Sequence, residues 1–311
     1  MTHHPPQGRE SWRHERRRLE DRLRRQWRRS TPFGERVRTL QADQLLNRAI
    51  VGALRMSGLY QRGRRNAGDL RLTQAEFRFA HLPPAFHGYG ILHLSDLHLG
   101  SQPELGAVWA ERLRGVEADL VAITGDFQCH GRPGPEETVE RLAPLLAALT
   151  PGDGVVAILG NHDEAGLVEA LEARGVTVLV NESRTLSRHG QHIHVVGTDD
   201  VHCFYTPAAP QALARCGDGF RIALVHSAEL ADHAEAAGYA LYLSGHTHGG
   251  QIALPGGRPL LTMLDRHRQL ARGVWRHGRL QGHTSAGTGT GEPPVRFNTR
   301  PEATLIRLLR H

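Results

Sequence analysis

Apolar runs and amphipathic segments alternate along the chain from Gly90 onward. Short apolar runs bounded by turn-forming residues are typical of buried strands, whereas apolar residues at helical spacing are typical of helices that cover a sheet. The predicted strands are 91–95, 118–124, 154–159, 176–181, 192–197, 221–226 and 240–244. The predicted helices are 103–115, 136–149, 164–174, 208–215 and 228–237. Alternation of the two kinds of segment predicts an α/β layered domain.

The pattern changes after Gly249, where short strand-like runs are separated by glycine and proline. We expect antiparallel pairing among these runs, which are 251–254, 272–276, 279–285 and 303–309. A further strand-like stretch, Glu76–Phe79, precedes the first core strand. The predicted fold class is α/β, with two packed mixed β-sheets flanked by helices and an Arg-rich helical extension at the N-terminus.

The first quarter of the chain has a helical pattern instead of this alternation. Residues 11–29 have the composition of a helix, with one narrow apolar stripe formed by Leu19, Leu23 and Trp27. Residues 37–60 are predicted to form a second helix, with an apolar face wide enough to be buried. We therefore divide the chain into a basic helical N-terminal extension, residues 1–75, and an α/β domain, residues 76–311.

The net charge of +6 is unevenly distributed between these two parts. Residues 1–75 hold 18 arginines and seven acidic residues, a net charge of +11, whereas residues 76–311 carry −5. A basic helix with an apolar stripe suits an anionic membrane surface, which residues 11–60 could contact. The same face could bind nucleic acid, and a third interpretation is a solvated helix resting on the α/β domain. The sequence leaves these alternatives open.

Composition also bears on the compartment. No run approaches the roughly 18 consecutive apolar residues of a membrane span, and no apolar segment follows the basic N-terminus as a secretory signal requires. Three cysteines, Cys129, Cys203 and Cys216, cannot build a disulfide framework and suit a reducing compartment. We expect a cytoplasmic protein, with a peripheral position on the inner membrane as an alternative.

Candidate metal ligands follow the ends of five predicted strands. The run Ile91–Gly100 places Asp96 and His98 two residues apart, where its strand should end. The other candidates, each after an apolar run or a glycine next to one, are Asp126, Asn161, His226, His246 and His248. Nitrogen and oxygen ligands without thiolate suit manganese, iron or zinc. Seven ligands are too many for one ion, so the set predicts two divalent metal ions that share Asp126.

Glycines at positions 125, 160 and 245 precede these residues and would let the backbone turn tightly toward a shared centre. Each motif has a plainer interpretation by itself. The Asp96 and His98 pair could lie on the surface, residues 160–163 could form a turn or helix cap, and His246 and His248 could pack on one strand face. Their joint arrangement after consecutive strand ends favours the metal site.

Most histidines outside these motifs are expected at the surface: His130, His202, His233, His267, His277 and His283. His202 is the one considered for a place near the substrate. Cys129 is expected near the metal site, as a small packing residue.

Five blocks, taken in order, resemble the calcineurin-like metallophosphoesterases: Asp96-x-His98, Gly125-Asp126, Gly160-Asn-His-Asp163, His226 and Gly245-His-Thr-His248. The resemblance covers residues 90–309 and implies the four-layer sandwich of that family. It assigns a first metal to Asp96, His98 and His248. It assigns a second metal to Asn161, His226 and His246, with Asp126 as the bridge.

The resemblance also implies a binuclear, metal-dependent phosphoric ester hydrolase. A metal-bridging hydroxide would attack phosphorus directly. His162 matches the catalytic histidine of the family and would lie beside the leaving-group oxygen, with Asp163 as its orienting partner. Mn²⁺ is the metal expected first, with Fe or Zn as alternatives.

Three stretches are similar to a bacterial branch of the family that is associated with membranes: 82–98, 245–251 and 294–302. Members of that branch resemble enzymes acting on lipid-linked phosphates, including UDP-2,3-diacylglucosamine hydrolysis. The implied substrate is therefore a phosphate ester or pyrophosphate, with a lipid-linked one as the specific expectation. The alternative is a nuclease or cyclic-nucleotide phosphodiesterase whose basic N-terminus binds nucleic acid. A metal-dependent scaffold without turnover is disfavoured by His162, which neither ion requires.

Overall fold

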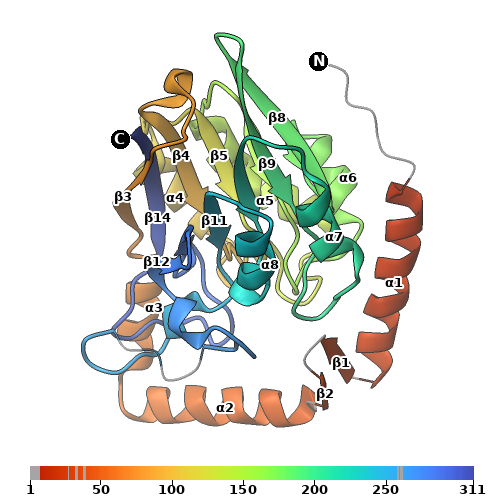
Figure 1. Ribbon diagram of the computed structural model, residues 1–311. Helices are drawn as coiled ribbons and strands as arrows, with labels where there is room; N and C mark the ends of the chain where they lie inside the picture. Colours follow the sequence, from red (N-terminus) through yellow and green to blue (C-terminus); the bar gives the residue numbers. More distant parts are fainter. Residues whose placement is uncertain (1–7, 27, 32–33, 38–39, 258, 260–261) are drawn as a thin grey trace.

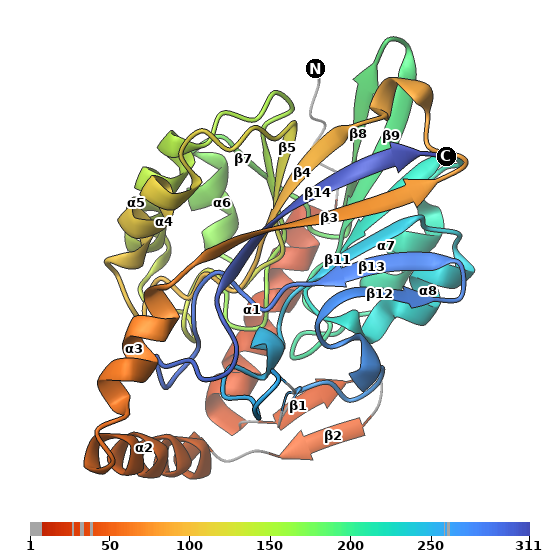
Figure 2. The same cartoon turned by 90° about the vertical axis from the view of Figure 1, so that its left-hand side faces the viewer.

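Two six-stranded β-sheets form the centre of the protein (Figures 1 and 2). The computed structural model describes residues 8–26, 28–31, 34–37, 40–257, 259 and 262–311. In the first sheet β4 to β7 run parallel, and β14 lies antiparallel to β4 and parallel to β3. Its strands, in spatial order, are β3 (Arg71–Phe79), β14 (Glu302–Arg310), β4 (Tyr89–Leu94), β5 (Leu120–Ile123), β6 (Val155–Ala157) and β7 (Val176–Val178).

The second sheet has a parallel centre with an antiparallel strand at each edge. Its strands, in spatial order, are β12 (Gly273–His277), β13 (Leu280–Thr284), β11 (Leu241–Ser244), β10 (Phe220–Leu224), β9 (Gln191–Gly197) and β8 (Glu182–Arg188). The carboxyl ends of the central parallel strands carry the loops that hold the predicted site residues.

Helices cover the outer face of each sheet, so the domain has four layers (Figure 1). The first sheet is covered by α4 (Leu105–Leu113), α5 (Pro135–Ala148) and α6 (Leu167–Glu172), and the second by α7 (Ala208–Arg215) and α8 (Ala231–Ala236). Because side chains alternate across a strand, Ile91 of β4 packs between the sheets while Leu92 packs beneath the helices. The predicted fold class is confirmed.

The structure differs from the predicted elements in three places. β8 was not predicted because its sequence is mostly polar. It is an edge strand, and all but one of its residues are exposed or half-buried. Residues 251–254 form isolated bridges at Ile252 and Ala253 instead of a strand. The expectation of antiparallel pairing after Gly249 holds for β12 with β13 and for β14 with β4. It fails on the other side of each strand, because β13 also pairs parallel with β11 and β14 pairs parallel with β3.

The N-terminal segment holds α1 (Arg9–Gln26), the hairpin of β1 (Arg28–Thr31) and β2 (Gly34–Val37), α2 (Leu40–Met56) and α3 (Tyr60–Gly68). The helix predicted over 11–29 therefore ends earlier, and the helix predicted over 37–60 corresponds to α2, whereas α3 starts at the last residue of that range and was not predicted. Trp27 lies outside the described residues. α1 runs beside the α/β layers in Figure 1 and is tied to α6 by ion pairs from Arg9 and Arg13 to Glu172 and Glu169. The division at residues 75 and 76 stays a prediction.

Among the helices of the described residues, none has both the length and the apolar character that crossing a bilayer requires.

The packing of α4 against the first sheet generates a stability prediction. Leu113 is fully buried there, so Leu113→Ala should lower the free energy of unfolding by about 2–5 kcal/mol through lost burial and the cavity left behind. Val108, on the same helix, is 38% exposed, and Val108→Ala serves as the control that should change little. Urea unfolding followed by circular dichroism measures both. Equal effects at the two positions would contradict the assigned packing.

Candidate metal centre

The predicted site residues meet where five strands from the two sheets end. Asp96 and His98 follow β4, Asp126 follows β5, and Asn161 follows β6 in the first sheet. The second sheet supplies His226 after β10, and His246 and His248 after β11. Since these strands are parallel within each sheet, their carboxyl ends lie at one edge. Convergence of side chains far apart in sequence thus follows from the topology.

Two groups of side chains form at this edge, and in each the candidate ligand atoms lie within 4.8 Å of one another. The first cluster consists of Asp96, His98 and His248, and the second of Asp126, His226 and His246. In the first, His98 Nε2 lies 3.0 Å from His248 Nε2, and His248 Nε2 lies 3.5 Å from Asp96 Oδ1.

Asp126 lies between the two clusters. Its Oδ2 is 3.6 Å from His98 Nε2 and 3.2 Å from His226 Nε2. Asn161 joins the second cluster, with Oδ1 3.1 Å from His226 Nε2. All seven predicted ligands are therefore brought together, and Asp126 has the position of a bridge.

The hydrogen bonds of two imidazoles fit these residues to cations. His98 Nδ1 lies 2.9 Å from the carbonyl oxygen of Gln128, and His226 Nδ1 lies 2.7 Å from that of Thr124. A carbonyl oxygen only accepts, so Nδ1 donates in both rings and Nε2 is the ring atom directed at the centre. His226 Nε2 faces the oxygens of Asp126 and Asn161. Oxygen atoms that converge on one nitrogen in this way favour a positive charge there, which a bound metal ion or a proton on Nε2 would supply.

Backbone strain marks the same residues. Five of the seven have positive φ angles, namely Asp96 (52°), His98 (44°), Asp126 (58°), His246 (70°) and His248 (51°). Such residues occupy a sparsely populated conformation that surrounding structure must enforce, and they concentrate at functional sites. Here the conformation turns each side chain from the strand end into the centre.

Positions 160 and 245 require glycine because carboxylate side chains lie very close to their backbone. Neither glycine has the positive φ angle expected of a tight turn. A Cβ on Gly160 would lie 2.1 Å from Asp126 Oδ1, and one on Gly245 would lie 2.2 Å from Asp96 Oδ2. Any larger residue would displace a carboxylate of the centre.

Burial and neighbouring charges set the protonation of the centre. Burial alone would raise the pKa of Asp126, but His226 and His162 hold this pKa well below its usual range. Burial opposes the charged form of His226, yet the Asp126 carboxylate outweighs it and raises the His226 pKa to about 10. Burial raises the pKa of Asp96 to about 6. Asp126 therefore stays ionised to a lower pH than Asp96 does.

His162 lies at the rim, with its side chain 23% exposed and Nε2 4.0 Å from Asp126 Oδ2. Its ring packs between those of His98 and His130, at centroid distances of 5.0 and 4.1 Å. Burial lowers the pKa of His162 to about 4, so the ring is neutral near pH 7. Its Nδ1 has no hydrogen-bond partner among the described residues.

Asp163 does not orient His162 as predicted. Its carboxylate accepts hydrogen bonds from the backbone amides of Asp126 and Gly160 at 2.8 Å and from that of Gln128 at 2.9 Å. The residue therefore ties the loop after β5 to the loop after β6. Burial, with the nearby Asp126 charge, raises the pKa of Asp163 to about 7. A Gly-Asn-His-Asp pattern alone gives no signal for this role.

Of three other residues that the sequence analysis singled out, two agree with the prediction and His283 departs from it. His202 is buried, and its ring lies 3.9 Å from that of His246, in agreement with the exception made for it. His283 was expected at the surface but is buried, with Nδ1 3.0 Å from that of His93. Cys129 lies near the centre as expected, with Sγ 3.6 Å from His98 Nδ1.

α1 reaches the same loops from outside the α/β layers. Arg16 is buried and donates hydrogen bonds to the carbonyl oxygens of Gly160 and Asp163, at 3.0 and 2.8 Å. It also pairs with Asp199 at 2.5 Å, and Asp199 accepts a second bond from Trp12. Three alternatives were considered for the basic helix: a membrane contact, a nucleic-acid contact and packing on the α/β domain. These bonds show that the face of α1 that carries Arg16 packs on the α/β domain.

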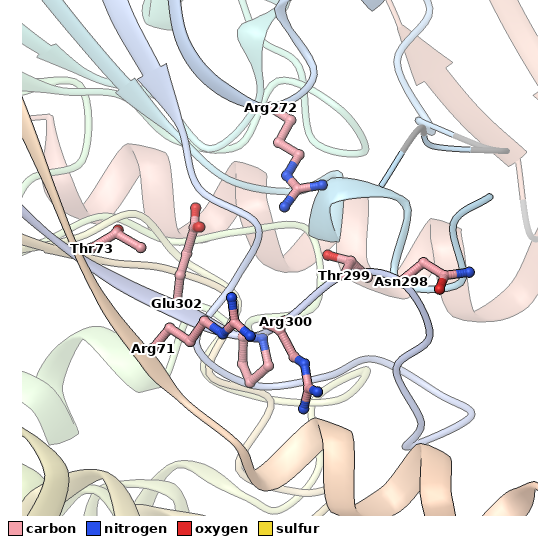
Figure 3. Close-up of a pocket in the computed structure, with 8 residues that line it drawn as sticks. Arg71, Thr73, Arg272, Asn298, Thr299, Arg300 and Glu302 are labelled. Carbon is pink, nitrogen blue, oxygen red and sulfur yellow. The ribbon is translucent and has the colours of Figure 1, made fainter. Parts of the chain in front are cut away.

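Two further features lie among other residues. Asp232, His267 and His277 form a third group of potential ligands, but Arg266 also pairs with Asp232, at 3.2 Å. A pocket of about 330 Å³ is lined by Arg71, Arg272, Arg300 and neighbouring residues from three segments, as Figure 3 shows. None of the predicted ligands lines that pocket.

Comparison with known proteins agrees with this geometry. Residues 89–250 match the family described as calcineurin-like phosphoesterase. The uncharacterized metallophosphoesterase YkuE of Bacillus subtilis (strain 168) is 32% identical over 77% of this chain and 85% of its own length. The phosphodiesterase YaeI of Escherichia coli (strain K12) is 27% identical over 71% of this chain and 82% of its own.

A third relative is the UDP-2,3-diacylglucosamine pyrophosphatase LpxG of Chlamydia trachomatis serovar D, 27% identical over 77% of this chain and 89% of its own. The match to the family spans more than half of the sequence and includes every predicted ligand. The chain belongs to the calcineurin-like phosphoesterase family and is a hydrolase of phosphate esters that uses divalent metal ions.

Proposed function

We propose that the chain hydrolyses a phosphodiester or pyrophosphate bond at a two-metal centre. The ligands of the first ion would be Asp96, His98 and His248, and those of the second Asn161, His226 and His246. Asp126 would bridge the two. The observation that carries the proposal is the position of Asp126 Oδ2, which lies between the Nε2 atoms of His98 and His226.

When bound, a pair of such ions lowers the pKa of water and neutralises charge on the phosphoryl oxygens. The side chains of the protein hold the ions in place and assist the leaving group. Asp126 stays ionised and fixes the separation of the two clusters. His162, neutral and at the rim, would donate a hydrogen bond from a ring N–H to the leaving-group oxygen as that oxygen gains charge.

Mn²⁺ is the ion we propose for both positions. The donor set contains imidazole nitrogen and amide or carboxylate oxygen without thiolate, which suits Mn²⁺ and also Fe or Zn. Coordination geometry and the availability of each metal decide which of these ions is bound. The native ion is therefore identified by the activity that each metal supports, and not by its affinity alone.

We propose a lipid-linked phosphate as the substrate, of the kind that UDP-2,3-diacylglucosamine represents. The name of the LpxG relative supports this class. Exposed apolar side chains on the N-terminal segment also support a lipid-linked substrate. The acyl chain of such a substrate needs an apolar surface at or near the membrane. A nuclease or cyclic-nucleotide phosphodiesterase is not favoured, since no comparison names such an activity among the relatives described above.

The same apolar side chains lead us to propose that the chain rests on an anionic membrane surface, at the cytoplasmic face of the inner membrane. Leu45 and Met56 of α2 are 63% and 86% exposed, and Leu59 is 40% exposed. Exposed arginines, including Arg48 and Arg55, lie on the same helix. An apolar and basic helix of this kind suits a bilayer interface. The contact predicted for residues 11–60 thus centres on α2.

Loss of the bridging carboxylate tests the metal mechanism. With Mn²⁺ present, bis(p-nitrophenyl) phosphate should be hydrolysed, and a chelator should abolish the reaction. Asp126→Asn should lower kcat/KM by more than the about 10–100-fold typical of residues that only support a ligand. Asp232→Asn, at the third group, is the control and should leave the rate unchanged. Turnover that survives chelation would rule out the mechanism.

Replacement of His162 tests its role toward the leaving group. His162→Ala should lower kcat by about 10²–10⁴-fold for a diester with a poor alkoxide leaving group, because the hydrogen bond is lost. The loss should be much smaller for p-nitrophenolate, which leaves without that help. Calorimetric titration with Mn²⁺ should give unchanged affinities. Equal losses with both leaving groups would contradict the assigned role.

Flotation with vesicles tests the membrane proposal. The protein should float with phosphatidylglycerol vesicles and less with phosphatidylcholine, and the double variant Leu45→Glu with Met56→Glu should lose most of the bound fraction. Val274→Glu, at a 59% exposed apolar position of β12, is the matched control and should still float. Unchanged flotation of the double variant would exclude α2 as the contact. Deletion of α1 is unsuitable because it would uncover Asp199.

A further inference from the structure

We propose that Arg16 of α1 is a positioning residue of the metal centre. Its guanidinium would fix the turn Gly160–Asp163, which presents Asn161 and His162 to the centre. This inference rests on the proposed two-metal function in taking Asn161 as a ligand. The N-terminal helix would then be a working part of the active site and not only a basic appendage.

The contacts of Arg16 with the turn carry the proposal. The residue is 1% exposed, and Nη2 donates to both ends of the turn, to the carbonyl oxygen of Gly160 at 3.0 Å and to that of Asp163 at 2.8 Å. Asn161 and His162 lie between those two carbonyls in the sequence. A donor that fixes both ends limits the motion of the ligand and of the histidine between them.

Arg16 is held in turn by acidic residues. Nη1 donates to Asp199 Oδ1 at 2.5 Å, and Nε donates to Glu20 Oε1 at 3.2 Å. The second oxygen of Asp199 accepts from the indole of Trp12 at 2.7 Å, and Glu20 Oε1 accepts from the amide of Ala165 at 2.8 Å. The guanidinium also lies 3.5 Å from the ring centroid of Phe204. The positive charge of Arg16 is thus compensated by two carboxylates, and its guanidinium is held in one orientation.

Through its contact with Asp199, Arg16 also holds a second loop. Asp199 and Phe204 bound the segment that follows β9, and this segment contains His202, whose ring lies 3.9 Å from that of His246. Asp200 fixes the segment internally by accepting from the amides of His202 and Cys203. Arg16 therefore joins a loop that carries Asn161 to a loop that packs on His246.

The planar fork of arginine explains why this residue type is needed. Arg16 uses Nε, Nη1 and Nη2 on four acceptors in fixed directions. A lysine ammonium is a single point on a flexible stem, so it cannot reach the carboxylates and both carbonyls together. Substitution by lysine would keep the buried charge beside Asp199 while losing the hold on the turn.

Docking of α1 and positioning of the turn can be separated by experiment. Arg9 pairs with Glu172 and Glu182, and Arg13 pairs with Glu169, so these contacts attach α1 without touching the turn. Arg9→Ala should therefore weaken docking alone. Arg17 is exposed on the same helix, and Arg17→Ala controls for loss of one positive charge.

The test uses the full-length protein with Mn²⁺, comparing Arg16→Lys and Arg16→Ala with the two controls. Calorimetric titration should show one ion bound as in the unchanged protein and the second bound about 10–100-fold more weakly. Hydrolysis of bis(p-nitrophenyl) phosphate should show a fall in kcat of the same order with a smaller change in KM. Arg9→Ala should lower Tm without either effect, and Arg17→Ala should change nothing.

Arg16→Lys decides the matter if Arg16→Ala does not fold. A folded lysine variant with unchanged affinity for the second ion and unchanged kcat would overturn the proposal, as would equal weakening of both ions. The unchanged protein is measured first. If it binds fewer than two ions or does not hydrolyse the diester, the two-metal function fails and this proposal falls with it.

Discussion

The ionised carboxylate of Asp126 is the group on which the rest of the structure depends. It is buried, and a buried charge is tolerated only where neighbouring groups compensate it. The amide of His162 donates to one oxygen and the imidazole of His226 approaches the other. The amide of Asp126 itself donates to Asp163. A large part of the surrounding loop structure therefore serves to hold one carboxylate in place.

The two-sheet architecture explains how so many polar groups reach one point. Each sheet is covered by helices on its outer face, and the inner faces pack together through apolar side chains. This arrangement leaves the carboxyl ends of the parallel strands as the place where both sheets can offer side chains at short range. Residues at the strand ends turn inward through positive φ angles, and the rigid sheets beneath them supply the packing that such strained conformations need.

The N-terminal helix changes the interpretation of the charge distribution. Its arginines were considered for membrane or nucleic acid, yet several pair with acids of the same chain: Glu169, Glu172, Glu182 and Asp199. Part of the positive charge of the N-terminal extension therefore pairs with acidic residues of the α/β domain. Other arginines of α1, such as Arg17 and Arg18, remain exposed and keep the solvent-facing surface of the helix basic.

The sequence by itself determined the fold class, the strands that carry the ligands and the identity of the residues that converge. These follow from local patterns, because an apolar run ending in glycine and a ligand-type residue is visible in a single segment. Only the tertiary structure decided the contacts of Arg16 and Asp163 with the loops of the centre. Among 38 arginines, nothing local distinguishes Arg16 as one that is buried. Its role arises from contacts with residues more than 140 positions away, which the packing of α1 alone brings together.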